Sequence, residues 1–170
     1  MFVNFCRQRI GHLLGALLLS FGGSAACGTT TLEGVVIKLS DGDTVTVLDA
    51  AKRSHRVRLA GIDAPEKKQA FGDRSRQSLS ELVFRQVVTV EYEKVDRYGR
   101  IVGKVKAGNL DANLVQVSRG MAWHYKAYEL EQQPKDRLAY SRAEEAAREA
   151  RQGLWRDPMP VAPWDFRRIR

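Results

Sequence analysis

The sequence predicts an α+β protein built mainly on a β-barrel, with five strands and three helices. Two features predict this class: short extended segments of β-branched and apolar residues fill the first half, and helical periodicity appears between and after them. The extended segments cover 32–47 with an interruption at 40–43, then 56–62, 87–95 and 100–106. A helix near 71–83 separates the third strand from the fourth, which is the element order of a five-stranded OB-fold barrel.

Turn and capping residues set the expected boundaries. Gly99 closes a tight hairpin because glycine readily adopts positive φ. Asn109 can cap a short helix that ends at Gly120, and a longer helix is expected from Asp136 to just before Gly153. This helix would present alanines on one stripe: Ala139, Ala143, Ala146, Ala147 and Ala150.

The N-terminal segment has the pattern of a secretory signal. Two arginines precede an apolar run over 13–21 and the small residues of 24–26. The run is too short and too interrupted by glycine for a membrane span, which needs about 20 apolar residues. We therefore expect residues 1–26 to be removed on export to the periplasm or the medium, with no stable membrane insertion. Lipid attachment at Cys27 is a weaker alternative.

The predicted mature chain has room for one domain, over 27–155, followed by a tail over 156–170. Cys6 lies in the signal, so Cys27 has no intramolecular disulfide partner. The tail contains three prolines and predicts an irregular strap with Trp164 and Phe166 against the body, and its arginines need do no more than keep the protein soluble.

The chain is basic, with a formal charge that falls from +8 to +6 when the two arginines of the signal are removed. This charge favours polyanionic partners such as nucleic acid, although basic secreted proteins are also common without such partners. We expect a monomer.

Three acids are candidates for a cation site. Asp41 and Asp43 leave the same face of an extended stretch, and Asp63 ends another strand that can reach the same point. Carboxylate oxygens suit a hard cation such as calcium, whereas zinc normally takes histidine or cysteine. The alternative interpretation of Asp41-Gly42-Asp43 is a simple turn.

Two arginines in strands have an equally simple alternative. Arg58 lies in an otherwise apolar strand that runs into a corner at Asp63-Ala64-Pro65, with Glu66 just beyond it. Arg58 can point outward beside Arg56, and Arg100 can be a solvated charge at a strand edge. Corners at strand ends, however, are where functional residues gather.

Three motifs together resemble the staphylococcal nuclease (thermonuclease) family. They are Asp41-Gly42-Asp43-Thr44, the run from Val57-Arg58-Leu59 into Ile62-Asp63-Ala64-Pro65-Glu66, and Asp96-Arg97-Tyr98-Gly99-Arg100. The resemblance spans about 32–155 and includes Asn113, Gly120, Ala122 and Gly153-Leu154-Trp155.

The resemblance implies a calcium-dependent endonuclease that cleaves DNA and RNA to 3′-phosphate and 5′-hydroxyl ends. It implies calcium ligands at the carboxylates of Asp43 and Asp63 and the carbonyl of Ala64, with Asp41 behind them. Ala64 stands where the family often has threonine, a change that keeps a carbonyl ligand. Catalytic roles fall to Arg58, Glu66 and Arg100.

The family resemblance is looser at the residues expected to contact the nucleic acid. Tyr125, Lys126 and Tyr128 would hold the strand, single-stranded or locally melted, by stacking and charge. Their alternative role is packing under the last helix, which we favour for Trp123. The alternative function for the whole chain is a catalytically inactive OB-fold module that binds single strands or a protein partner.

Overall fold

The computed structural model describes residue 1 and residues 30–169. Apart from Met1, the predicted signal and Cys27 lie outside the described residues. Within the described part of the chain, no helix is both long enough and apolar enough to cross a bilayer.

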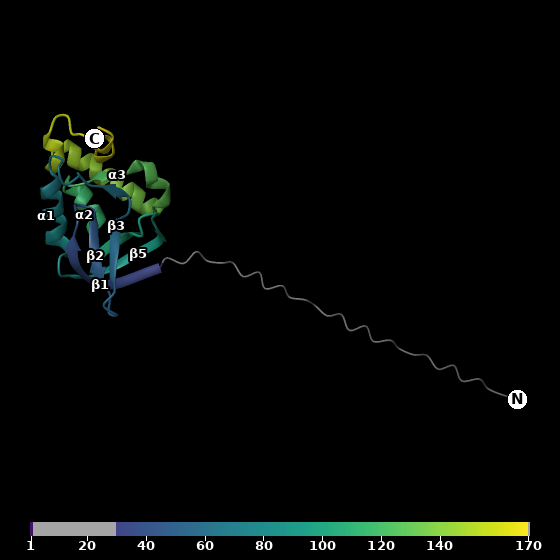
Figure 1. Cartoon of the computed structure of the whole chain (residues 1–170). Helices are drawn as coiled ribbons and strands as arrows, with labels where there is room; N and C mark the ends of the chain where they lie inside the picture. The colour runs from purple at the N-terminus through teal and green to yellow at the C-terminus, as the bar shows by residue number, and fades with distance from the viewer. Residues whose placement is uncertain (2–29, 170) are drawn as a thin grey trace.

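Five strands close into a barrel, which confirms the predicted fold class (Figure 1). Neighbouring strands follow the order β3-β2-β1-β5-β6, and parallel pairing of β3 with β6 completes the ring. The strands are β1 (Thr30–Leu39), β2 (Thr44–Leu48), β3 (Ser54–Leu59), β5 (Val87–Val95) and β6 (Ile101–Ala107). A two-residue strand β7 (Leu110–Asp111) extends the sheet beside β6.

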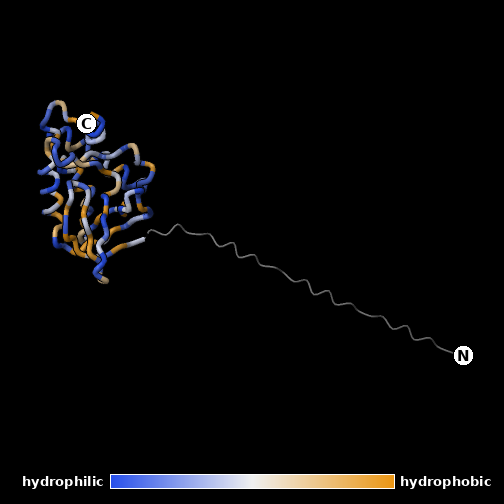
Figure 2. The backbone as a smooth tube through the Cα atoms, viewed as in Figure 1, coloured by the Kyte–Doolittle hydropathy of each residue, from blue (hydrophilic) through white to orange (hydrophobic). Residues whose placement is uncertain are grey.

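Alternation along the strands places branched side chains inside the barrel. Val45, Val47, Val57 and Leu59 are each at most 1 % exposed, whereas Arg56, next to Val57, faces solvent. Figure 2 shows apolar stretches concentrated along these strands. The barrel therefore encloses one cluster of buried apolar side chains, which continues under the helices.

The hairpin between β5 and β6 forms as predicted. Gly99 has φ of +73°, and the Asp96 side chain accepts hydrogen bonds from the backbone N–H groups of Tyr98 and Arg100, both at 2.9 Å. The same aspartate thus fixes both the turn and the residue that follows it.

Three helices pack against the barrel: α1 (Gly72–Val83), α2 (Ala112–Ser118) and α3 (Pro134–Glu149). The cap of α2 is Asp111, whose side chain accepts the Leu114 N–H at 3.0 Å, so the prediction of Asn109 was wrong. Strand β7 intervenes between Asn109 and the helix, which moves the start of α2 further along the chain.

The predicted alanine stripe of α3 is only partly buried. Ala147 is buried and Ala139 and Ala143 pack against the core, while Ala146 and Ala150 are exposed. Tyr140 of the same helix is also buried, and its hydroxyl donates to Asp111 at 3.0 Å.

A second pair of strands connects the barrel to the last third of the chain. Strand β4 (Ile62–Asp63) pairs with β8 (Trp123–His124), and the Tyr125 N–H donates to the Gly61 carbonyl at 2.8 Å. The 3₁₀ helix η1 (Lys126–Glu131) follows directly. Residues after β8 are thereby held beside Asp63.

The tail is more ordered than the sequence predicted. After the 3₁₀ helix η2 (Gly153–Arg156), the chain forms a short helix α4 (Pro163–Arg168) instead of an irregular strap. Pro163 occupies the start of α4, where a missing backbone N–H costs nothing. As predicted, Trp164 packs against the body, and Figure 1 shows the C-terminal end beside α3.

Candidate active site

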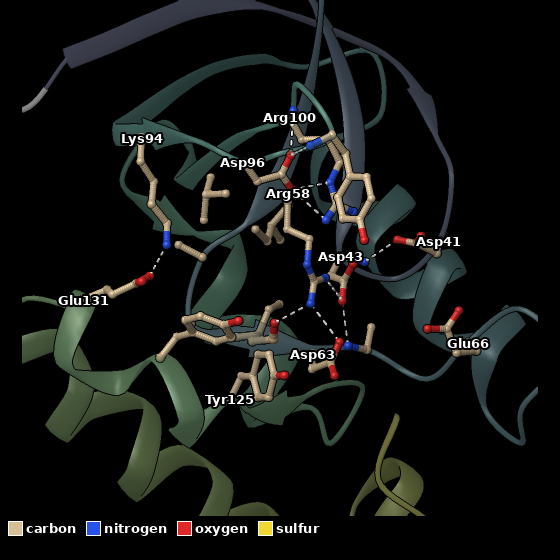
Figure 3. A pocket seen from close by; sticks show the side chains of 18 of the residues that line it. Asp41, Asp43, Arg58, Asp63, Glu66, Lys94, Asp96, Arg100, Tyr125 and Glu131 are labelled. Atoms are coloured by element: carbon tan, nitrogen blue, oxygen red, sulfur yellow. Dashed lines mark hydrogen bonds and ion pairs between the residues drawn. The ribbon is translucent and has the colours of Figure 1, made fainter. Parts of the chain in front are cut away.

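One cavity of about 720 Å³ opens at the side of the barrel, where β3, β4, the β5–β6 hairpin and the tail meet. Residues far apart in the sequence line it together: Asp41, Asp43, Arg58, Asp63, Ala64, Glu66 and Arg100 (Figure 3). The structure thus brings the sequence-predicted acids and arginines to one place.

Arg58 lies at the centre of the cavity between two carboxylates. Its Nη1 pairs with Asp43 Oδ2, and its Nη2 donates to Asp63 Oδ1 at 2.7 Å. The Arg58 side chain is only 15 % exposed, so the interpretation of an outward-pointing solvated charge is wrong. Burial alone would lower the pKa of Arg58, but the two aspartates outweigh it and raise the pKa further.

Asp43 is held in its ionised form. Burial would raise the pKa of this carboxyl, but the charge and hydrogen bonds of Arg58 and the backbone N–H of Ala64 lower it below its usual value. The Ala64 N–H donates to Asp43 Oδ2 at 2.7 Å, which ties the corner after β4 to the loop before β2.

Asp41 has the opposite electrostatic environment. Burial and the neighbouring charge of Asp43 raise the pKa of Asp41 to about 7. Its Oδ1 accepts the Asp43 backbone N–H at 3.1 Å, so Asp41 lies behind Asp43 and shapes the loop. The Asp41-Gly42-Asp43 segment is therefore a turn and also part of the site.

Gly42 is required in this loop by close packing. A Cβ atom at this position would lie 1.8 Å from Ser75 Oγ of α1 and 2.9 Å from the Ala64 Cβ. Gln116 of α2, which is fully buried, donates from Nε2 to the Gly42 carbonyl at 2.8 Å and to the Ser75 carbonyl at 3.0 Å. Sequence reasoning missed these two hydrogen bonds of Gln116, since a lone glutamine in a helix gives no signal of its partners.

Replacing Gln116 with leucine is expected to lower the free energy of unfolding by about 1–3 kcal/mol, because two buried carbonyls lose their donor. Urea denaturation monitored by circular dichroism measures this loss. Gln77→Leu on the exposed face of α1 is the matched control and should change stability by less than about 0.5 kcal/mol. Equal losses of stability in the two variants would contradict a stabilising role for the hydrogen bonds of Gln116.

Glu66 lies at the rim of the cavity with its side chain 36 % exposed. Its backbone N–H donates to Gln69 Oε1 at 3.1 Å, which holds the turn before α1. The Oε1 atom of Glu66 accepts a hydrogen bond from Arg167 Nη1 at 2.8 Å. The carboxylate is therefore fixed in position and still open to water.

Arg100 lines the same cavity and is paired with Asp96. Both Nε and Nη2 of Arg100 lie 2.8 Å from Asp96 Oδ2. The side chain is 22 % exposed, less than a solvated edge charge would be. Asp96 therefore stabilises the hairpin turn and also orients the Arg100 side chain. The second role could not be predicted from the turn motif alone.

The predicted nucleic-acid contacts divide between two places. Tyr125 and Tyr128 line the cavity, with ring centroids 5.1 Å apart. Lys126 instead lines a smaller neighbouring cavity and pairs with the buried carboxylate of Glu144 at 3.2 Å. Trp123 is 9 % exposed and packs edge-on against Trp155, in agreement with the packing role favoured from the sequence.

Arg167 was missed by sequence reasoning. The tail arginines were interpreted as solubilising, but Arg167 lines the cavity and contacts Asp63 and Glu66. The apolar residues Pro163, Trp164 and Phe166 indicate an anchored tail but not which side chain reaches the site.

The donor set is suited to a hard cation. Asp43 and Asp63 already share one positive group, the Arg58 guanidinium, and their oxygens are donors of the kind that calcium prefers over zinc. Neither His55 nor His124 lines the cavity. Within residues 1 and 30–169, no group of three or more His, Cys, Asp or Glu side chains is arranged to hold a metal. The oxygens of Asp43 and Asp63 contact Arg58, and those of Asp63 also contact Arg167.

The barrel and its cavity define a class of protein. An OB-fold barrel with acids and guanidinium groups around one open cavity is suited to binding and hydrolysing a phosphate ester, since arginine forks bind phosphate oxygens and carboxylates hold cations or activate water.

Comparison with known proteins identifies the family. The family model described as "Staphylococcal nuclease homologue" matches residues 56–157. The chain is 42% identical to an uncharacterized endonuclease of Haemophilus influenzae over 156 residues, 92% of this chain and 84% of that protein. It is 46% identical to the micrococcal nuclease of Shigella flexneri over 145 residues, 80% of each chain. The protein belongs to the staphylococcal nuclease family and is a nuclease that hydrolyses phosphodiester bonds.

Proposed function

We propose that this nuclease is a calcium-dependent endonuclease that cleaves DNA and RNA and leaves 3′-phosphate and 5′-hydroxyl ends. One observation carries the proposal: two buried aspartates, a solvent-open glutamate and two arginines from separate elements face one cavity.

Arg58 and Arg100 would bind the phosphate. A guanidinium fork matches two phosphate oxygens, and its benefit grows as negative charge builds on the phosphorus in the transition state. Each of the two is preoriented by carboxylates, Arg58 by Asp43 and Asp63, and Arg100 by Asp96. The forks are therefore held toward the cavity before a strand enters.

Asp43, Asp63 and the carbonyl of Ala64 would hold calcium, with Asp41 behind them. When bound there, calcium supplies a Lewis acid for the phosphate and a template for water. Glu66 would orient or deprotonate the attacking water, because its carboxylate is fixed by Arg167 and remains solvent-accessible.

Tyr125 and Tyr128 would receive bases of a single-stranded or locally melted substrate, since aromatic faces stack on bases of any sequence. Lys126 would act beside the main cavity, on a neighbouring part of the strand. We further infer that the protein is exported, which the signal-like segment of 1–26 supports. We also propose that it acts as a monomer.

Cleavage of circular single-stranded DNA is expected with calcium, and EGTA should reduce its rate by about 10²-fold or more, because charge at the phosphorus loses its compensating cation. Gel electrophoresis follows the loss of the circle, which has no ends and so reports endonuclease cleavage. Excess calcium should restore the rate. Full activity in EGTA would contradict calcium dependence.

The product ends are tested on the same digests. New 5′-hydroxyl ends accept phosphate from a polynucleotide kinase without prior phosphatase treatment. Labelling that requires phosphatase would contradict the proposed polarity of cleavage, and degradation of an RNA strand under the same conditions tests the second substrate.

A further inference from the structure

The C-terminal helix places the guanidinium group of Arg167 in the active-site cavity. Arg167 Nη2 donates to Asp63 Oδ2 at 2.7 Å, and its Nη1 donates to Asp63 Oδ1 at 3.3 Å and to Glu66 Oε1 at 2.8 Å. It contacts the two carboxylates assigned above to the cation and to water. The side chain is 42 % exposed and therefore remains accessible from the cavity.

The tail that carries Arg167 is firmly seated. Trp164 stacks on Tyr125 with ring planes 9° apart and centroids 5.3 Å apart, and it packs edge-on against Trp123. Gln69 Nε2 donates to the Val161 carbonyl at 2.6 Å, and Pro163 is buried. These contacts fix the start of α4, so the position of Arg167 over the cavity is built into the fold.

The charges around Asp63 indicate what Arg167 can bind. Asp43, Asp63 and Glu66 bring three negative charges together, and Arg58 and Arg167 compensate two of them. The charge of Arg100 is already matched by Asp96. A phosphodiester would add a fourth negative charge, which a divalent cation and both Arg58 and Arg167 would balance. A cation at Asp63 would also compete for the oxygens that Arg167 now contacts, which frees Arg167 Nη2 for a phosphate oxygen while Nη1 keeps its contact with Glu66.

We propose that Arg167 is a phosphate-binding residue of this nuclease, which contacts the substrate strand at or next to the scissile phosphate. This inference rests on the proposed function. The opposite role, a plug that keeps cation and substrate out, uses the same contacts but predicts a gain when Arg167 is removed.

The first test is binding of a short phosphorothioate DNA strand, which keeps the backbone charge and resists hydrolysis, to the full chain in calcium. Fluorescence anisotropy of a labelled strand is expected to show about 10-fold or more weaker binding for Arg167→Ala. The slope of the logarithm of the binding constant against the logarithm of salt concentration should shrink by about 0.7, the value for one lost phosphate contact. A purely structural role would not move this slope.

Arg156→Ala is the matched control. Arg156 lies in the same C-terminal segment, at the end of η2, and its side chain is exposed and lines neither cavity. This variant removes the same charge and should leave the affinity within about twofold of the parent and the salt slope unchanged. Arg167→Lys, which keeps the charge without the fork, should retain the salt slope and recover part of the affinity.

Cleavage of denatured DNA under the same conditions separates the outcomes. A fall of about 10- to 100-fold in kcat/KM for Arg167→Ala, with Arg156→Ala unchanged, supports the proposal. Tighter binding or faster cleavage by Arg167→Ala would establish a plug and overturn it, and so would equal behaviour of the two alanine variants. If the parent protein itself cleaves nothing in calcium, the proposed function fails, and this inference fails with it.

Discussion

Arg58→Ala is expected to slow hydrolysis of denatured DNA by about 10²-fold or more, because the transition state loses a charge-assisted fork worth ~3 kcal/mol. The central place of Arg58 between Asp43 and Asp63 underlies this expectation. Single-turnover rates at saturating calcium report the effect on the chemical step. Arg58→Lys should recover little, since an ammonium keeps the charge but cannot bind two phosphate oxygens at once.

The same substitution has a consequence for stability. Asp63 keeps its contact with Arg167, but Asp43 loses its guanidinium partner while remaining buried. Breaking a buried pair from one side costs about 3–5 kcal/mol. We therefore expect a lower melting temperature in EGTA and partial recovery in calcium, and rates should be compared only where the variant is folded.

Arg56→Ala is the control for Arg58→Ala. Arg56 lies two residues earlier in β3 with an exposed side chain. Its removal alters the basic surface without touching the cavity, so cleavage should change by less than about threefold. Equal rates for Arg58→Ala and Arg56→Ala would mean that Arg58 does not bind the reacting phosphate.

Glu66→Gln is expected to reduce cleavage by about 10²- to 10⁴-fold, the range for loss of a general base. Glutamine has nearly the same shape, so the fold and the turn before α1 should persist, because that turn uses the backbone N–H of residue 66. The lost negative charge should leave strand binding unchanged or slightly tighter. The contrast between impaired turnover and retained binding identifies a role in chemistry.

The measurement pairs cleavage rates with anisotropy of the phosphorothioate strand. Glu145→Gln, on the exposed face of α3, is the control and should match the parent in both. A Glu66→Gln variant that cleaves at the parent rate would remove Glu66 from the mechanism, and one that fails to bind would assign it to binding.

Several parts of the fold were predictable because their signals are local. Alternation in β2 and β3 marks strands whose inner side chains are buried, and Asp96 with Gly99 encodes the hairpin. The cap of α2 and the buried face of α3 were not predictable in detail. Both depend on Asp111, which ends β7, caps α2 and accepts the Tyr140 hydroxyl at once.

The site shows the same division. Motif order was enough to select Asp43, Arg58, Asp63, Glu66 and Arg100 as candidates, and the structure places all five at one cavity. The contact of Lys126 with Glu144 and the contact of Arg167 with Asp63 connect residues 18 and 104 positions apart, and neither has a sequence pattern.

By itself, the sequence determined the family, the barrel class and the residue types that phosphodiester hydrolysis needs, because short-range periodicity and ordered motifs encode them. Only the tertiary structure decided which charges compensate one another. Ion pairs depend on distance and burial in three dimensions, so a tail arginine far along the chain becomes part of the site only when α4 seats Arg167 on Asp63 and Glu66.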